Sequence, residues 1–182
     1  LIWSIYHTMH TGEGPQRIVV ASSRNSMKTL SAAIIRFYSM IHFRRSGTHL
    51  AATMDQSQSL LMYLDKFLAT PGVIEHVSVS NTKMKTLDGL PVNSFTKNSK
   101  CMLRVAVATK AGVNSQRGSF NSKDESELIP PEILRESSFI ADRTLDEHRF
   151  GPIELELSSR KLADGPIQKK MDEATSPNPP DD

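Results

Sequence analysis

The chain has 182 residues, 38% of them hydrophobic, which is enough apolar material for the core of one domain of ordinary size. Its 22 basic and 20 acidic side chains leave a net charge of only +2, so overall charge is not a nucleic-acid signature and any DNA contact must be local. The absence of an apolar run of roughly 18 residues and of a secretory signal pattern predicts a soluble cytoplasmic protein without a membrane span.

Two strand–helix units are predicted in the first half of the chain. Residues 17–21 are short, β-branched and apolar, as in a buried strand, and residues 30–43 carry apolar side chains at helical spacing. A second strand over residues 48–53 precedes a helix that Asp55 can cap and that Pro71 and Gly72 end. Two such units predict an α/β fold, with a mainly parallel central sheet flanked by helices.

The second half shows shorter segments. We expect strands and hairpins over residues 73–107 with turns at Asp88-Gly89 and Lys97-Asn98, a polar stretch over 114–127, a helix over 129–141 that opens at Pro130-Pro131, and an alternating strand over 152–157. Residues 1–174 are expected to form the domain. Residues 175–182 are too polar and proline-rich to fold and are expected to be a flexible tail.

The polar loop between the first strand and helix has the placement of a phosphate-binding loop. Such a loop reads GxxxxGK followed by Ser or Thr, because backbone N–H groups and the helix N-terminus together surround the phosphates. Here Lys28 would meet the β and γ phosphates of ATP, and the Thr29 hydroxyl would coordinate Mg²⁺.

Both glycines of that pattern are replaced. Ser22 occupies the first position and Met27 the second, where a Cβ and a long side chain could obstruct the backbone conformation or the approach of phosphate. A polar loop that merely caps the helix is the alternative interpretation of the same residues.

Three stretches resemble the large terminase subunit of tailed bacteriophages. They are SSRNSMKTLSAAIIRFY (residues 22–38), similar to its Walker A region, THLAATMDQSQSLLMYLDKFL (48–68), similar to the following strand and helix, and ELSSRKLADGPIQKKMDEA (156–174), similar to its coupling region. The likeness covers residues 15–175 in the expected order. It implies a P-loop ATPase core in which Ser23, Arg24, Asn25, Ser26, Met27, Lys28 and Thr29 bind ATP.

The resemblance also implies roles for two carboxylates. Asp124 would help to hold Mg²⁺ and Glu125 would be the catalytic base, with Glu127 as an alternative acid if the register slips by two. In the family these residues follow an apolar strand. Here the preceding residues include Asn121 and Lys123, which would each need a partner or a solvent path, and the alternative is a solvated loop.

Ser158, Ser159 and Arg160 match the family position that senses the γ-phosphate and couples hydrolysis to movement. Their alternative is a polar turn that ends a strand. Arg24 is the arginine that the family carries four residues before the lysine. It could stabilise transition-state charge as a catalytic residue, or cover the sheet edge.

The implied function is a Mg·ATP-dependent motor domain that moves double-stranded DNA into a capsid in the host cytoplasm. The family implies oligomerisation at a portal protein and cooperation with a small terminase subunit. The family's nuclease domain would not fit in 182 residues, so DNA cleavage is not predicted. A catalytically impaired nucleotide-binding or assembly protein of the same fold is the alternative, and a helicase-like ATPase or a small-molecule kinase is a third.

Other catalytic and metal chemistry is not indicated. Cys101 is the single cysteine, which excludes an intrachain disulfide and a multi-cysteine zinc site, and we expect a half-buried thiol in a strand. His42, His49, His76 and His148 lack the spacing of a metal site and are expected to be structural or surface residues. No GxSxG elbow supports a serine triad.

Overall fold

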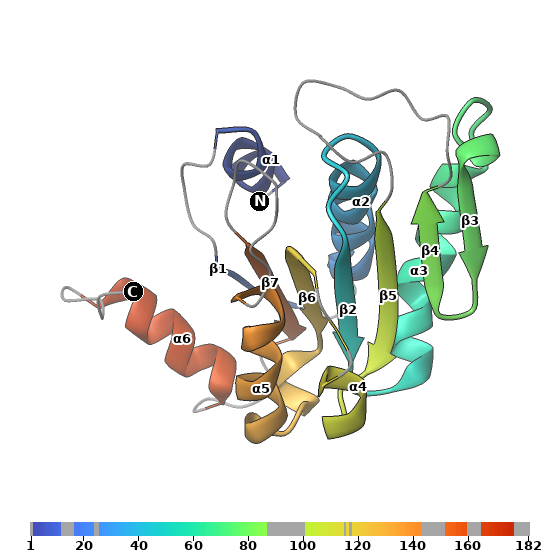
Figure 1. Ribbon diagram of the computed structural model, residues 1–182. Coiled ribbons are helices and arrows are strands. Elements are labelled where there is room, and N and C mark those ends of the chain that lie inside the picture. Colours follow the sequence, from blue (N-terminus) through green and yellow to red (C-terminus); the bar gives the residue numbers. More distant parts are fainter. Residues whose placement is uncertain are drawn as a thin grey trace.

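The computed structural model describes residues 2–11, 17–23, 26–86, 101–114, 116, 118–142, 152–159 and 165–176. Over these residues seven strands form one sheet, in the order β1-β7-β6-β2-β5-β4-β3 (Figure 1). The strands are β1 (Arg17–Ser22), β2 (Gly47–Ala51), β3 (Val77–Ser80), β4 (Lys83–Thr86), β5 (Met102–Val107), β6 (Phe120–Asp124) and β7 (Ile153–Ser159). The helices are α1 (Ile2–Thr11), α2 (Lys28–Ile41), α3 (Met54–Leu68), α4 (Lys110–Asn114), α5 (Pro131–Asp142) and α6 (Pro166–Thr175), with 3₁₀ turns η1 (Ile74–His76) and η2 (Ser126–Leu128).

The sheet is mainly parallel, as the sequence predicts. Strands β1, β7, β6, β2 and β5 pair in parallel, whereas the β3–β4 hairpin continues the sheet in antiparallel pairing with β5. The predicted α/β fold with helices flanking a parallel sheet is therefore confirmed. No helix in the described part of the chain has both the length and the apolar character needed to cross a membrane.

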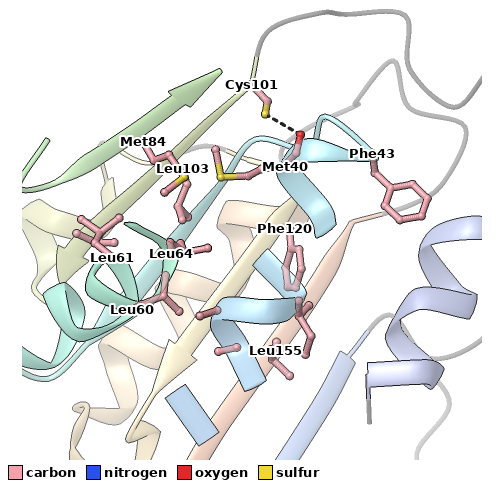
Figure 2. Packing of buried hydrophobic residues seen from close by; sticks show 14 of the residues in the cluster. Met40, Phe43, Leu60, Leu61, Leu64, Met84, Cys101, Leu103, Phe120 and Leu155 are labelled. Carbon is pink, nitrogen blue, oxygen red and sulfur yellow. Dashed lines mark hydrogen bonds between the residues drawn. The ribbon is translucent and has the colours of Figure 1, made fainter. Parts of the chain in front are cut away.

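One face of the sheet carries the larger core. Helices α2 and α3 pack their apolar stripes on this face, where Met40, Leu60 and Leu64 are buried against Leu103 and Phe120 (Figure 2). The predicted helix over residues 30–43 corresponds to α2, which begins two residues earlier, at Lys28. The burial of these side chains from water is the main force that holds α2 and α3 on the sheet.

Helices α4 and α5 cover part of the opposite face. Their smaller cluster buries Leu50, Val113 and Leu134 together with neighbouring aliphatic side chains. Helix α5 begins at Pro131, as expected for a proline in the first turn. The parallel strands β2, β6 and β7 are thus buried along their whole length.

Several local expectations need correction. Helix α1 was not predicted. Strand β1, which was expected to be buried, lies at the edge of the described sheet, and Val19 is 36% exposed there. Thr53, not Asp55, caps α3, because its side chain accepts a hydrogen bond from the Gln56 amide at 3.3 Å.

The segment from residue 73 to 107 does contain a hairpin, but its turn lies at Asn81 and Thr82. The predicted turns at Asp88-Gly89 and Lys97-Asn98 lie outside the described residues. Cys101 is buried just before β5, where its thiol donates to the Met40 carbonyl at 3.4 Å, and is not half-buried within a strand. For the predicted tail, α6 extends to Thr175, and residues 177–182 lie outside the described part.

Candidate nucleotide-binding site

The loop between β1 and α2 brings the polar residues singled out in the sequence to the carboxyl end of the sheet. Ser22 ends β1, and its hydroxyl lies 2.6 Å from the Ser26 hydroxyl across the loop. Met27 is the N-cap of α2, and its carbonyl accepts a hydrogen bond from the Ser31 amide at 2.9 Å. Arg24 and Asn25 lie outside the described residues.

Met27 has the backbone conformation that a glycine would favour. Its φ of 57° and ψ of 27° are left-handed, a region that costs a residue with a Cβ about 1–2 kcal/mol. The side chain is 69% exposed. The loop therefore has the backbone conformation of a glycine although a methionine occupies the position. The methionine does not prevent this conformation but makes it strained.

Thr29 and Asp124 contact each other directly. The Thr29 hydroxyl, in the first turn of α2, donates to Asp124 Oδ2 at 2.8 Å, although the two residues are 95 positions apart in the chain. Asp124 is the last residue of β6, and its Oδ1 accepts the Glu125 amide at 2.9 Å. The structure thus joins the helix start to the end of a strand through one carboxylate.

The environment of Asp124 raises the pKa of its carboxyl above the ordinary value. Burial is the main cause, because it disfavours the charged form, and the neighbouring Glu125 charge acts in the same direction. Hydrogen bonds from Thr29 and the Glu125 amide oppose the shift, as does the Lys28 charge. The neighbouring groups therefore do not fully offset the cost of burying the Asp124 charge. A further positive charge beside this carboxylate would stabilise its ionised form.

Lys28, Ser159 and Glu125 form a second contact group beside the first. The Lys28 ammonium donates to Ser159 Oγ at 2.9 Å and to the Ser23 carbonyl at 3.1 Å, and it lies 3.9 Å from Glu125 Oε1. Ser159 in turn donates to Glu125 through its hydroxyl at 3.1 Å and its amide at 3.4 Å. The Glu125 carboxylate is therefore held at the same end of the sheet as Lys28.

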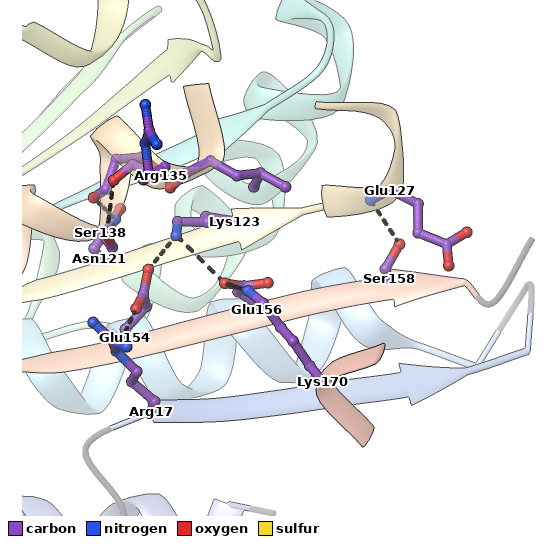
Figure 3. Close-up of polar contacts among 12 residues, drawn as sticks. Arg17, Asn121, Lys123, Glu127, Arg135, Ser138, Glu154, Glu156, Ser158 and Lys170 are labelled. Atoms are coloured by element: carbon purple, nitrogen blue, oxygen red, sulfur yellow. Dashed lines mark hydrogen bonds and ion pairs between the residues drawn. The ribbon is translucent and has the colours of Figure 1, made fainter. Parts of the chain in front are cut away.

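The two serines of the predicted coupling position have different surroundings. Both belong to the end of β7 and do not follow it, so their side chains point to opposite faces. Ser159 faces Lys28, whereas the Ser158 hydroxyl accepts the Glu127 amide at 3.3 Å and so fixes η2 (Figure 3). Arg160 lies outside the described residues. Glu125, not Glu127, is the carboxylate next to Lys28.

The segment before the carboxylates is a strand, and not the solvated loop that was the alternative. All five residues of β6 are buried. Asn121 donates to the Ser137 carbonyl at 2.8 Å, and the Lys123 ammonium lies between Glu154 and Glu156 of β7, 3.4 Å from the Glu156 carboxylate (Figure 3). The polar residues thus have the partners that a buried strand requires.

Sequence reasoning missed the wider charge cluster around Lys123. Arg17 of β1 pairs with Glu154 at 3.2 Å, and Lys170 of α6 pairs with Glu156 (Figure 3). Burial raises the pKa of the Glu156 carboxyl, but the Lys123 and Lys170 charges outweigh it and hold the pKa below the ordinary value. The sequence does carry a signal for this cluster, because Glu154 and Glu156 alternate along the strand predicted over residues 152–157. Two such residues place their carboxylates on the same face of the sheet.

A second buried polar group lies on the α2 side of β6. The Arg36 guanidinium donates to Ser122 Oγ at 3.1 Å and lies 3.9 Å above the Phe120 ring. Ser122 Oγ is also 2.9 Å from His49 Nδ1. Burial, together with the Arg36 charge, lowers the pKa of His49 to about 3, so this histidine is a neutral structural residue. Within the described residues, no group of three or more His, Cys, Asp or Glu side chains could hold a metal ion.

Comparisons with known proteins agree with this architecture. No protein-family model matches the chain, and no curated protein matches it in sequence. The large terminase of bacteriophage HK97 superposes with a TM-score of 0.74 at 11% identity over 95% of this chain and 36% of the terminase. The large terminase ATPase domain of Thermus phage P74-26 gives 0.58 at 19% identity, over 87% of this chain and 65% of the domain.

The large terminase of a thermophilic bacteriophage, in complex with ATP-γ-S, gives a TM-score of 0.58 at 11% identity over 86% of this chain and 36% of the terminase. The chain thus spans about a third of the length of the full-length terminases that it resembles. At these identities the likeness concerns the fold. This chain has the fold of the ATPase domain of phage large terminases.

Proposed function

We propose that the loop between β1 and α2 binds Mg·ATP and that the chain hydrolyses it. The observation that carries the proposal is the convergence of five side chains at one end of the sheet. Lys28 would bind the β and γ phosphates, Thr29 and Asp124 the Mg²⁺ ion, and Glu125 would orient or deprotonate the attacking water. Ser159 would hold Glu125 in position.

The residues fit the metal that this chemistry needs. Mg²⁺ prefers hard oxygen ligands, and the Thr29 hydroxyl and Asp124 carboxylate lie within 2.8 Å of each other. Asp124 is 4% exposed, and burial raises the pKa of its carboxyl, so added positive charge would stabilise the ionised form. Once bound, Mg²⁺ would neutralise phosphate charge during phosphoryl transfer.

The contacts of Lys28 suggest how nucleotide binding would reach the catalytic carboxylate. Lys28 donates to Ser159 and to the Ser23 carbonyl. Phosphate oxygens would compete with these two acceptors for the Lys28 ammonium, because hydrogen bonds between two charged groups are the stronger ones. The Ser159 hydroxyl would then keep its hydrogen bond to Glu125 without the contact from Lys28. Binding of the γ-phosphate would thereby change the surroundings of Glu125.

The remaining residues of the predicted site complete the proposal. Asn25 and Ser26 would bind phosphate together with the loop backbone. Arg24 would stabilise transition-state charge, and Arg160 would couple hydrolysis to movement. These roles rest on the resemblance to large terminases.

The resemblance also gives the wider role that we propose. The chain would act as the ATPase part of a terminase in the host cytoplasm, assembled as a homo-oligomer at a portal protein with a small terminase subunit. ATP hydrolysis would drive double-stranded DNA into the capsid. Two solved structures of the thermophilic-phage terminase contain ADP or ATP-γ-S, which supports an adenine nucleotide as the ligand.

Met27 favours a second candidate, a nucleotide-binding protein with impaired turnover. Its left-handed backbone is strained, and a side chain occupies the position next to Lys28 where the usual loop has none. Binding through Lys28 and Thr29 is compatible with this candidate. The two candidates therefore differ in turnover and share the binding step.

Calorimetric titration of Mg·ATP tests the shared step first. We expect saturable binding by the native chain, loss of binding in Lys28→Ala, and unchanged binding in Lys66→Ala, which removes an exposed lysine from α3. Absence of binding by the folded native chain would refute both candidates. Turnover that duplex DNA stimulates would then favour the motor over a small-molecule kinase.

A further inference from the structure

The antiparallel part of the sheet has one face that no described helix covers. Residues alternate between faces along β3, β4 and β5, and on the α3 side Met84 and Leu103 are buried in the main core. Helices α4 and α5 lie over the parallel strands on the other side, and the β3–β4 hairpin projects beyond them (Figure 1). The residues that face away from α3 on these strands are Ser78, Ser80, Lys83, Lys85, Met102 and Arg104.

This surface, which we call the hairpin face, is positively charged. Lys83 and Lys85 are exposed, and Arg104 lies opposite Lys83 in the strand pairing. None of the three forms an ion pair with a residue that the structure describes, and no acidic residue occupies these strand positions. The hairpin face thus concentrates charge in a chain whose net charge is only +2.

Arg104 adds a third positive charge to the hairpin face, opposite Lys83. Its Nε atom is buried, yet it has no hydrogen-bond partner among the described residues. An unsatisfied donor of this kind is unfavourable because it has given up its hydrogen bonds to water. The charge of the guanidinium, which is partly exposed as a whole, would attract an anion bound beside Lys83.

We propose that the hairpin face binds the phosphate backbone of double-stranded DNA. Lys83 and Lys85 are two residues apart on one strand, which separates them by about 7 Å along an open, pleated surface. Such a row suits an extended polyanion, because duplex DNA presents one negative charge about every 1.7 Å of its axis and can meet the cations in any register. The serine hydroxyl of Ser78, opposite Lys85, is a further donor of the kind that contacts phosphate.

The position of the hairpin face fits a motor in which DNA and nucleotide bind together. Strand β3 lies at one edge of the described sheet, and β1, which leads into the nucleotide loop, lies at the other (Figure 1). DNA on the hairpin face would leave the Lys28 loop accessible. The inference adds a DNA surface to the proposed function and does not depend on hydrolysis.

Fluorescence anisotropy with a labelled duplex of about 30 base pairs tests the inference over a series of salt concentrations. Each lost phosphate contact lowers the salt slope of log K by about 0.9, so Lys83→Ala/Lys85→Ala should lose nearly 2 units of slope and about tenfold or more in affinity at low salt. The control Lys66→Ala/Lys169→Ala removes the same charge from exposed positions on α3 and α6 and should bind almost as the native chain does.

Mg·ATP titration of the same variants separates this inference from the proposed function. Unchanged ATP binding with weakened DNA binding in Lys83→Ala/Lys85→Ala would support the hairpin face. Equal losses in that variant and in the control would overturn it, as would failure of the native chain to bind duplex at low salt. Tighter binding of a single strand than of the duplex would also overturn it, and in each case a positive ATP titration would leave the nucleotide site standing.

Discussion

Replacing Met27 by glycine should stabilise the protein, although it removes a side chain. The left-handed backbone at Met27 costs about 1–2 kcal/mol with a Cβ present, and glycine removes that cost. Glycine also gives the unfolded chain about 0.4–1 kcal/mol more conformational entropy. Because the methionine is 69% exposed, little apolar burial is lost. The difference leaves a net gain of roughly 0–1.5 kcal/mol for Met27→Gly.

Met27→Ala is the matched control, because it removes the long side chain but keeps the Cβ. We expect Met27→Gly to be about 1 kcal/mol more stable than Met27→Ala, which corresponds to roughly 2–4 °C in Tm for a domain of this size. Urea and thermal unfolding of the two variants measure the difference. An alanine variant at least as stable as the glycine variant would refute the assignment of backbone strain to this position.

ATP turnover of the same two variants identifies what the methionine does to catalysis. If only Met27→Gly turns over faster than the native chain, the Cβ and the backbone are limiting. If both variants turn over faster, the long side chain obstructs the phosphates. If neither variant turns over faster than the native chain, Met27 does not limit turnover.

Further predictions concern the carboxylate and the buried charges. Asp124→Asn should weaken ATP binding in Mg²⁺ but change it little in EDTA, as measured by calorimetry. Lys123→Met should lower the free energy of unfolding by about 3 kcal/mol, because it leaves two buried carboxylates without their shared cation. Lys170→Ala, at a partly exposed ion pair, should lower it by less than about 1 kcal/mol. Urea titrations measure both values. His49 has a pKa near 6.5 in the unfolded chain but of about 3 in the folded chain. The free energy of unfolding should therefore fall as the pH falls between these values, by up to about 1.4 kcal/mol per pH unit. His49→Asn should reduce this pH dependence, as measured by unfolding at a series of pH values.

The parallel core of the fold could be predicted because its signals are local. The apolar stripe of α2 and the β-branched run of β1 specify their elements within a few residues. The edge position of β1 could not be predicted, because strand order depends on contacts with β7, more than a hundred residues away. Helix α1 lacks an acidic first turn, and its segment carries no clear start signal.

The placement of Lys28 and Thr29 was predictable for the same reason, since both stand between a local strand and a local helix. The contact between Thr29 and Asp124 was expected only through the resemblance, because the residues before Asp124 lack the apolar signature of a buried strand. A strand with polar side chains is predicted to be exposed to solvent unless the partners of those side chains are known. The partners of Lys123 come from a different strand, and a single sequence does not show that pairing.

The charge cluster explains how a polar strand can place the candidate carboxylates accurately. Lys123 contacts both Glu154 and Glu156, and these contacts exist in only one register of β6 against β7. A slip by one residue would turn every side chain to the other face and separate Asp124 from Thr29. Apolar neighbours would tolerate such a slip better than a buried ion pair, which loses most of its stabilisation when its geometry fails. The ion pairs therefore specify the position of the site at some cost in stability, which a uniformly apolar strand would avoid.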